Sequence, residues 1–122
     1  MADGAISWWE MNVPDMERAT AFYGAVAAWD LQPMEGFEGY VIVNVGGVGV
    51  GALQASQDGD PQGRSTRLYV EVSDLEDTLA RVRQNGGTVE QERMPVPGDQ
   101  WVATARDPFG NSIGFATNNP AK

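Results

Sequence analysis

The sequence predicts an α+β fold built from two consecutive strand–helix–three-strand repeats in a single domain. The chain has 122 residues, the usual size of one domain. Strand patterns and helix patterns alternate along it, and the run Val13–Glu17 recurs in order and character as Val72–Glu76. We therefore expect one domain over residues 1–122, with a first repeat at about 5–55, a linker at about 56–65 and a second repeat at about 66–118.

The first repeat begins with a strand. Residues 6–13 are mainly apolar and β-favouring, and Pro14 with Asp15 ends the run. Asp15 is a natural N-cap, and apolar residues recur behind it at helical spacing, which predicts a helix to about Ala28. Further strands are expected between glycine-rich turns, at residues 29–32, 40–45 and 48–54.

The second repeat follows the same order. A strand is expected at residues 67–72, Asp74 is a second N-cap, and Gly86-Gly87 marks the end of a second helix. The helix carries its apolar stripe on Leu75, Leu79 and Val82. Three more strands are expected, with the turn Asp107–Asn111 joining the last two, at residues 88–93, 100–105 and 112–116.

Composition excludes several kinds of chemistry. The chain has no cysteine and no histidine, so disulfides, thiolate ligands and imidazole bases are absent, and a metal site would need carboxylates and carbonyls. The formal net charge of −9 opposes nucleic-acid binding and is compatible with cationic small molecules. No apolar run is long enough to span a membrane, and the N-terminal residues MADGAI lack the features of an export signal, so we expect a cytoplasmic protein.

Two motifs identify a family resemblance. The segment VPDMERATAFYGAV follows the first strand and ARDPFGNSIGF precedes the last, within two strand–helix–three-strand units. Together they resemble the vicinal oxygen chelate superfamily of glyoxalase I, bleomycin-resistance and extradiol dioxygenase proteins, nearest to its predicted lactoylglutathione-lyase-related group. The resemblance covers nearly the whole chain and implies the glyoxalase/bleomycin-resistance fold, in which the two units form a half-open barrel around a cleft. It also implies that the chain forms a homodimer.

The resemblance also indicates where metal ligands stand in metal-dependent members. The matching positions here are Trp8, Arg67 and Gly114. None of these residues can act as a carboxylate or imidazole ligand, and Arg67 adds a positive charge. We therefore expect no metal and no other cofactor.

Strand alternation predicts which residues line the cleft. If Trp9, Met11 and Val13 pack beneath the first helix, then alternate residues of the first strand face the cleft, and the second repeat offers equivalent positions. The predicted ligand-binding residues are Trp8, Glu10, Asn12, Arg67, Tyr69, Glu71, Trp101 and Gly114. Trp101 can lie either in the cleft or under a helix, and Glu10 can form an ion pair with Arg67, contact a ligand or act as a base.

These residues favour a metal-independent protein that binds a small molecule, with sequestration of an aromatic or cationic compound such as an antibiotic as one role. One alternative is an enzyme, a lyase or isomerase of glyoxalase type, with Glu10 as its catalytic base and no metal. Another is a non-catalytic assembly domain. The run Gly46–Leu53 resembles a phosphate-binding loop but lacks its Lys-Ser/Thr ending, so we interpret it as a tight hairpin with a closely packed strand.

Overall fold

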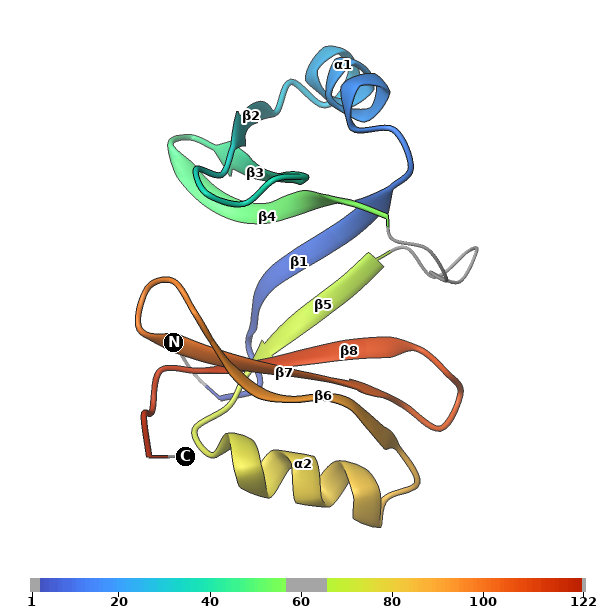
Figure 1. Cartoon of the computed structure of the whole chain (residues 1–122), viewed down its shortest axis with the longest axis vertical. Coiled ribbons are helices and arrows are strands. Elements are labelled where there is room, and N and C mark those ends of the chain that lie inside the picture. Colours follow the sequence, from blue (N-terminus) through green and yellow to red (C-terminus); the bar gives the residue numbers. More distant parts are fainter. Residues whose placement is uncertain (1–2, 57–65, 122) are drawn as a thin grey trace. The chain divides into compact units, whose positions relative to one another are not determined.

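A computed structural model of the chain describes residues 3–56 and 66–121 (Figure 1). In chain order its elements are β1 (Ile6–Val13), α1 (Met16–Val26), β2 (Asp30–Pro33), β3 (Tyr40–Val45), β4 (Val48–Ala55), β5 (Thr66–Glu71), α2 (Leu75–Gln84), β6 (Thr88–Val96), β7 (Gln100–Arg106) and β8 (Ser112–Thr117). This order confirms the α+β class and both strand–helix–three-strand repeats. The predicted linker, apart from Ser56, lies outside the described residues.

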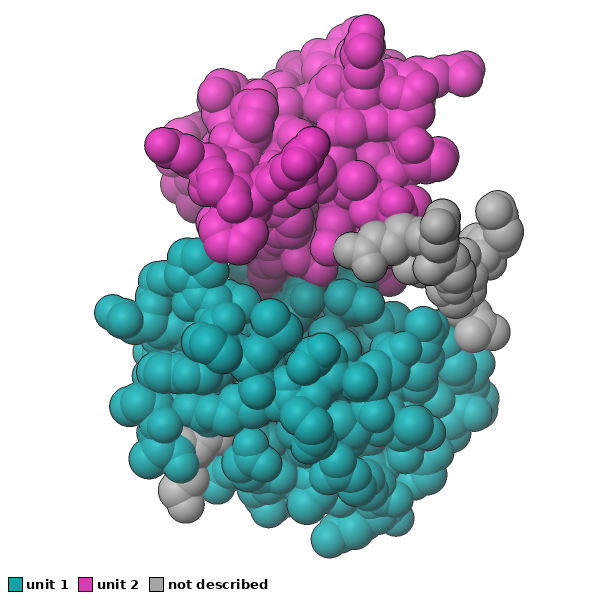
Figure 2. All heavy atoms as spheres, in the orientation of Figure 1, with its two compact units in different colours: residues 1–7, 67–122 teal, residues 8–66 magenta. Residues whose placement is uncertain are grey.

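The chain divides into two compact units, coloured separately in Figure 2. Unit 2 comprises Trp8–Thr66, and unit 1 comprises Met1–Ser7 with Arg67–Lys122. The N-terminal segment belongs to unit 1 because it pairs with β5. Within unit 1, the amide of Gly4 donates to the Glu71 carbonyl and the amide of Glu71 donates to the Ala5 carbonyl, both at 2.8 Å.

Unit 2 contains a sheet of strand order β2-β3-β4-β1, with β1 and β4 parallel and the other neighbours antiparallel. Its buried core consists of Val13, Val41, Val43 and Leu53. Trp9 and Met11 of β1 pack against this core together with Met16, Ala19 and Tyr23 from α1. The expected packing of Trp9, Met11 and Val13 beneath the first helix is therefore confirmed.

Helix α1 begins where the sequence predicts. The Asp15 side chain accepts a hydrogen bond from the Arg18 amide at 3.0 Å, which satisfies a donor at the helix start. The helix ends at Val26, slightly before the expected Ala28, because Ala28 adopts a left-handed conformation with φ of 57°. This turn brings Trp29 back to the core, where its ring stacks on Tyr23 with a centroid separation of 5.1 Å.

The segment Gly46–Leu53 forms the predicted hairpin. Gly46 and Gly47 connect β3 to β4 with φ values of 60° and 80°, which glycine adopts without strain. Further along β4, the ring of Trp9 lies where a Cβ at Gly51 would stand. The glycines of this segment therefore serve the turn and the close packing of β4.

Unit 1 contains a sheet of strand order β5-β8-β7-β6, in which β5 and β8 are parallel. Its buried core consists of Leu75, Leu79 and Ala103. Val72, Val89, Trp101 and Phe115 pack against that core. Strand β6 extends to Val96, beyond the expected Arg93, and continues to pair with β7 through Pro95 and Val96.

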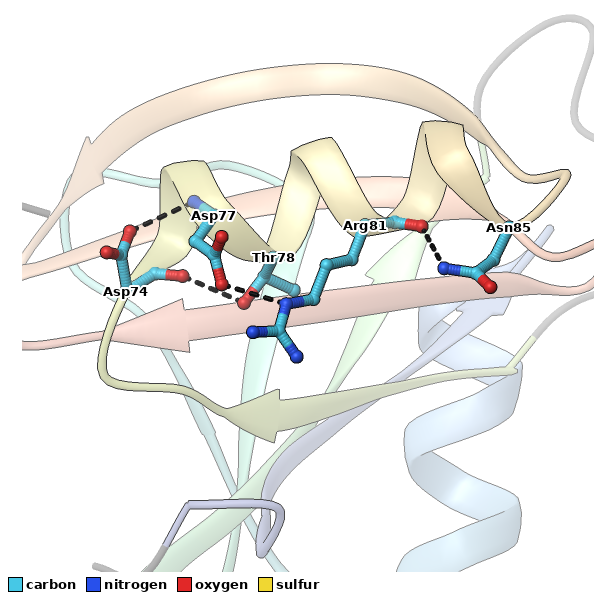
Figure 3. Close-up of polar contacts among 5 residues, drawn as sticks. All are labelled: Asp74, Asp77, Thr78, Arg81 and Asn85. Carbon is cyan, nitrogen blue, oxygen red and sulfur yellow. Dashed lines mark hydrogen bonds and ion pairs between the residues drawn. The ribbon is translucent and has the colours of Figure 1, made fainter.

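Helix α2 is held by polar contacts at both ends (Figure 3). Asp74 accepts from the Asp77 amide at 2.9 Å and, through its carbonyl, from the Thr78 hydroxyl at 2.8 Å. Arg81 donates to Asp77 at 2.9 Å, one turn apart on the exposed face. The Asn85 side chain donates to the Arg81 carbonyl at 2.8 Å and closes the last turn. Asp74 is thus the N-cap that the sequence predicts.

The turn between β7 and β8 is organised around Asp107. Its carboxylate accepts from the Asn111 side chain at 3.0 Å, the Asn111 amide at 2.8 Å and the Phe109 amide at 2.9 Å. These hydrogen bonds, the Asn111 side chain first among them, hold the pKa of Asp107 below its usual value. The predicted turn between the last two strands is confirmed.

Candidate functional site

Trp8 and Glu10 lie on the face of the unit 2 sheet opposite α1, because strand alternation places Trp9 and Met11 on the helix side. Tyr40 of β3 joins them. The Trp8 indole Nε1 donates to the Tyr40 hydroxyl at 2.9 Å, and that hydroxyl donates to Glu10 Oε2 at 2.7 Å. Trp8, Tyr40 and Glu10, hereafter the Trp8 triad, are all partly buried.

Strand pairing brings the Trp8 triad together. Glu10 is paired with Ala52 of β4, and Ala52 is paired with Ile42 of β3, two residues from Tyr40. Ala52 is fully buried and small, so side chains from β1 and β3 can meet above it. Asn12 pairs with Gln54, the β4 residue that also pairs with Tyr40. Asn12 therefore lies on the same face as the Trp8 triad.

The Trp8 triad combines a fixed carboxylate with two aromatic rings. A hydroxyl that donates to a carboxylate makes a short, charge-assisted hydrogen bond, and such a bond restricts the rotamers of both partners. Because Tyr40 also accepts from Trp8, one hydroxyl orients both an acidic group and an indole. Such a surface can stack on a planar molecule and attract a positive charge.

Tyr40 was not among the site residues predicted from the sequence. Its strand is predicted correctly, but Tyr40 reaches Glu10 through the register of β1, β4 and β3, which no local pattern encodes. The sequence does contain one signal. Tyr40 and Glu10 carry polar groups, whereas their neighbours on the opposite face of each strand, Val41 and Met11, are apolar.

Unit 1 carries a second polar group on the face of its sheet opposite α2. Arg67 Nε donates to Ser112 Oγ at 2.8 Å, and Arg67 Nη1 donates to the Tyr69 hydroxyl at 3.4 Å. The Tyr69 ring lies against Gly114, in the space that a Cβ at that position would fill. Arg67, Tyr69 and Gly114 are therefore neighbours within unit 1, as alternation predicts. That residues of both units contact one ligand stays a prediction of the sequence.

Glu71 continues the same face of β5 and is paired with Ala116 of β8. It is 8% exposed, a strong degree of burial for a carboxylate. Trp101 was predicted as a ligand-binding residue, with a place either in the cleft or under a helix, and the structure places it under a helix. It packs beside the α2 core, and the Arg93 guanidinium lies over its ring at 4.8 Å. Trp101 therefore contributes to the packing of unit 1.

The positions that hold metal in the resembled superfamily do not fit a metal ion here. Trp8 and Arg67 use their side-chain nitrogens as hydrogen-bond donors, and Gly114 has no side chain. Across residues 3–56 and 66–121, no three acidic side chains gather closely enough to hold a metal ion. Neither helix in this part of the chain has the length and apolar character required to cross a bilayer.

Solved structures share this fold. A member of the glyoxalase/bleomycin resistance protein/dioxygenase superfamily from Vibrio splendidus aligns with a TM-score of 0.67 at 19% identity, over 89% of this chain and 95% of that one. A methylmalonyl-CoA epimerase from Mycobacterium tuberculosis aligns with a TM-score of 0.65 at 18% identity, over 99% of this chain and 94% of that one. A hypothetical protein from Bacillus halodurans aligns at 0.69 and 17% identity, over 95% of both chains. At these identities the likeness establishes the fold.

A search of curated proteins finds no match to the chain. The family model described as the glyoxalase-like domain matches residues 8–115, which include most of both repeats and all the residues of the Trp8 triad. The chain belongs to the glyoxalase-like domain family.

Proposed function

We propose that this protein binds a small aromatic or cationic molecule, without a metal ion, through the Trp8 triad. The observation that carries the proposal is the pair of hydrogen bonds from Trp8 to Tyr40 and from Tyr40 to Glu10. They hold an indole, a phenol and a carboxylate in one arrangement on the face of the sheet that α1 does not cover. Sequestration of an antibiotic is one role that such binding would serve.

Pre-organisation supports a binding role. A ligand that meets an already ordered carboxylate and aromatic rings avoids part of the entropy cost of fixing those side chains. The rings supply apolar contact area and a negative face, and the carboxylate supplies charge. The net charge of −9 adds long-range attraction for a cation. Together these features favour a planar or aromatic compound that carries a positive charge.

The proposal is tested by calorimetric titration with proflavine, a planar aromatic cation, against the wild type and Glu10→Gln. We expect the wild type to bind and Glu10→Gln to bind about tenfold more weakly, since a charge-assisted contact is worth about 1.4 kcal/mol or more. Glu38→Gln is the matched control, because Glu38 is an exposed acid in the loop before β3 of the same unit. Equal affinity in Glu10→Gln and Glu38→Gln would count against the Trp8 triad as the binding site.

A second candidate function is an isomerase or lyase of glyoxalase type with Glu10 as its base. The hydrogen bond from Tyr40 favours it, because a base needs a fixed orientation toward the proton that it removes. Methylmalonyl-CoA epimerases among the structures of the same fold make a thioester a reasonable first substrate to try. Incubation with methylmalonyl-CoA in D₂O, followed by NMR, would show deuterium entering beside the carbonyl. If Glu10 is a base, Glu10→Gln abolishes this exchange while retaining substrate affinity.

A further inference from the structure

We infer that Glu71, on the face of the unit 1 sheet opposite α2, is the anchor for the N–H groups of an organic ammonium ion. Glu71 is the last residue of β5. The inference concerns residues of unit 1 alone, so it goes beyond the proposed function of the Trp8 triad, and either can fail without the other.

The burial of Glu71 has no structural compensation within the described residues. Its side chain takes part in no hydrogen bond or ion pair there, although the residue is 8% exposed. Arg67, the cation on the same face of β5, donates instead to Ser112 and Tyr69 and lies about 13 Å away along the strand. A buried carboxylate without a partner is costly, so its presence calls for a ligand or a catalytic use.

The row of residues paired with Glu71 across β8, β7 and β6 is apolar. It pairs with Ala116 of β8, which pairs with Val102 of β7, which in turn pairs with Met94 of β6. Residues paired across neighbouring strands share a face, so this row offers the carboxylate no hydrogen-bond donor from a side chain. Along this row, a donor for Glu71 would have to come from a bound molecule or from water.

The carboxylate remains reachable. In the described residues, one side-chain nitrogen or oxygen atom is completely enclosed and has no hydrogen-bond partner, and it is Arg93 Nη1, not an oxygen of Glu71. Since the Glu71 oxygens also lack a partner, they must retain some accessible surface. The carboxylate is therefore strongly buried but not completely enclosed, which suits a group that receives a ligand.

The chemistry of this face favours an ammonium ion with N–H groups over a metal ion. No group of acidic residues that could hold a metal occurs in the described part of the chain. A carboxylate suits a cation that donates hydrogen bonds, whereas a quaternary ammonium has no proton to donate.

The test is an amide NMR titration of the whole chain with three probes: benzylammonium, benzyltrimethylammonium and benzyl alcohol. We expect benzylammonium to shift the amides of Glu71, Ala116 and Val102 in a saturable manner. Benzyltrimethylammonium should bind at least about fivefold more weakly because it cannot donate to the carboxylate, and benzyl alcohol should give no saturable shift at these amides. Equal affinity for the two cations, or no saturable shift with benzylammonium, would overturn the inference.

Two variants separate the contact from the overall charge. Glu71→Gln should weaken benzylammonium binding at least about tenfold, whereas Glu76→Gln should change it less than about twofold. Glu76 is a matched control because it is an exposed acid in the first turn of α2 of the same unit. Equal losses in both variants would attribute the effect to net charge and overturn the inference.

The melting temperature tests whether Glu71 has a purely structural role. Replacing an unpartnered buried carboxylate by a neutral amide removes a desolvation cost, so Glu71→Gln should melt at the same or a higher temperature than the wild type. A melting temperature lower by more than about 5 °C would show that Glu71 stabilises the fold and would contradict its assignment as a ligand anchor.

Discussion

Tyr40 donates its hydroxyl hydrogen to Glu10 across 2.7 Å and accepts a hydrogen bond from Trp8 with the same oxygen. One phenol thereby fixes the two side chains on which the proposed binding function depends. The relationship joins β3 to β1 across β4, and it accounts for a partly buried carboxylate on the face of the unit 2 sheet away from α1.

Removing this hydroxyl should weaken the fold of unit 2. We expect Tyr40→Phe to lower the free energy of unfolding by about 1–2 kcal/mol, because one charge-assisted and one neutral hydrogen bond are lost. Urea unfolding measures the change. Tyr23→Phe is the control, since Tyr23 donates to the sulfur of Met11, a weak acceptor, and should cost less. A smaller loss in Tyr40→Phe than in Tyr23→Phe would contradict the role given to Tyr40.

Packing against glycine makes a prediction for unit 1. A methyl group at Gly114 would overlap the Tyr69 ring, so Gly114→Ala should destabilise the protein by about 1–3 kcal/mol. Gly24, in α1, has nothing within 4 Å of an added Cβ. Gly24→Ala should instead stabilise by about 0.5–1 kcal/mol, since alanine is the better helix former. Unfolding curves of both variants measure this contrast, and a neutral Gly114→Ala would contradict the described contact.

The turn at Asp107 predicts a pH dependence. Its pKa is lowered in the folded state, so the folded protein favours the ionised form, and its contribution to stability is present above the unfolded-state pKa. That contribution disappears as the pH falls through the lower folded-state value. Asp107→Asn should therefore lower the melting temperature near pH 7, and the difference from the wild type should shrink toward about pH 3.

Melting curves at the two pH values test this expectation, with Glu38→Gln, an exposed acid outside the turn, as the control. A difference between the wild type and Asp107→Asn that does not change with pH would show that the hydrogen bonds from Asn111 and Phe109 do not favour the ionised form of Asp107.

Metal ions should not stabilise this protein. Trp8 and Arg67 occupy two of the superfamily's metal positions with hydrogen-bond donors, and Gly114 leaves the third without a side chain. A ligand that binds the native state raises the melting temperature, so a metal ion without a site leaves it unchanged. We expect less than about 1 °C change in melting temperature on adding Ni²⁺, Zn²⁺, Mn²⁺ or Fe²⁺. A clear increase with one of these ions would contradict our interpretation of these positions.

Local signals predicted the elements well. Asp15 and Asp74 cap the helices because a short acidic side chain satisfies amides three residues ahead, an interaction that the sequence shows directly. Gly46-Gly47 likewise favours a turn through its backbone freedom. These features act within a few residues, so the pattern of two repeats can be recognised from the order of the residues alone.

The site was predicted less completely because it depends on pairing between distant strands. Alternation placed Trp8 and Glu10 on the correct face, yet Tyr40 joins them through two strand registers that the sequence does not reveal. The residues of the Trp101 strand alone do not show which face of the sheet Trp101 occupies. In the structure Ala103, two residues later and therefore on the same face, is paired with Phe115 and lies in the core beneath α2, so Trp101 also lies on the α2 side.

The most direct test of the central claim is a tryptophan-fluorescence titration of the wild type and Trp8→Phe. The panel comprises cationic and peptide antibiotics, glutathione thioesters and planar aromatic metabolites. Trp29→Phe is the control, because Trp29 packs in the unit 2 core against Trp9 and Tyr23.

We predict that one class of compound quenches the wild type and Trp29→Phe at low micromolar concentration, and that Trp8→Phe loses this response. If no compound changes the fluorescence of the wild type, or if Trp8→Phe responds as the wild type does, the Trp8 triad is not the binding site.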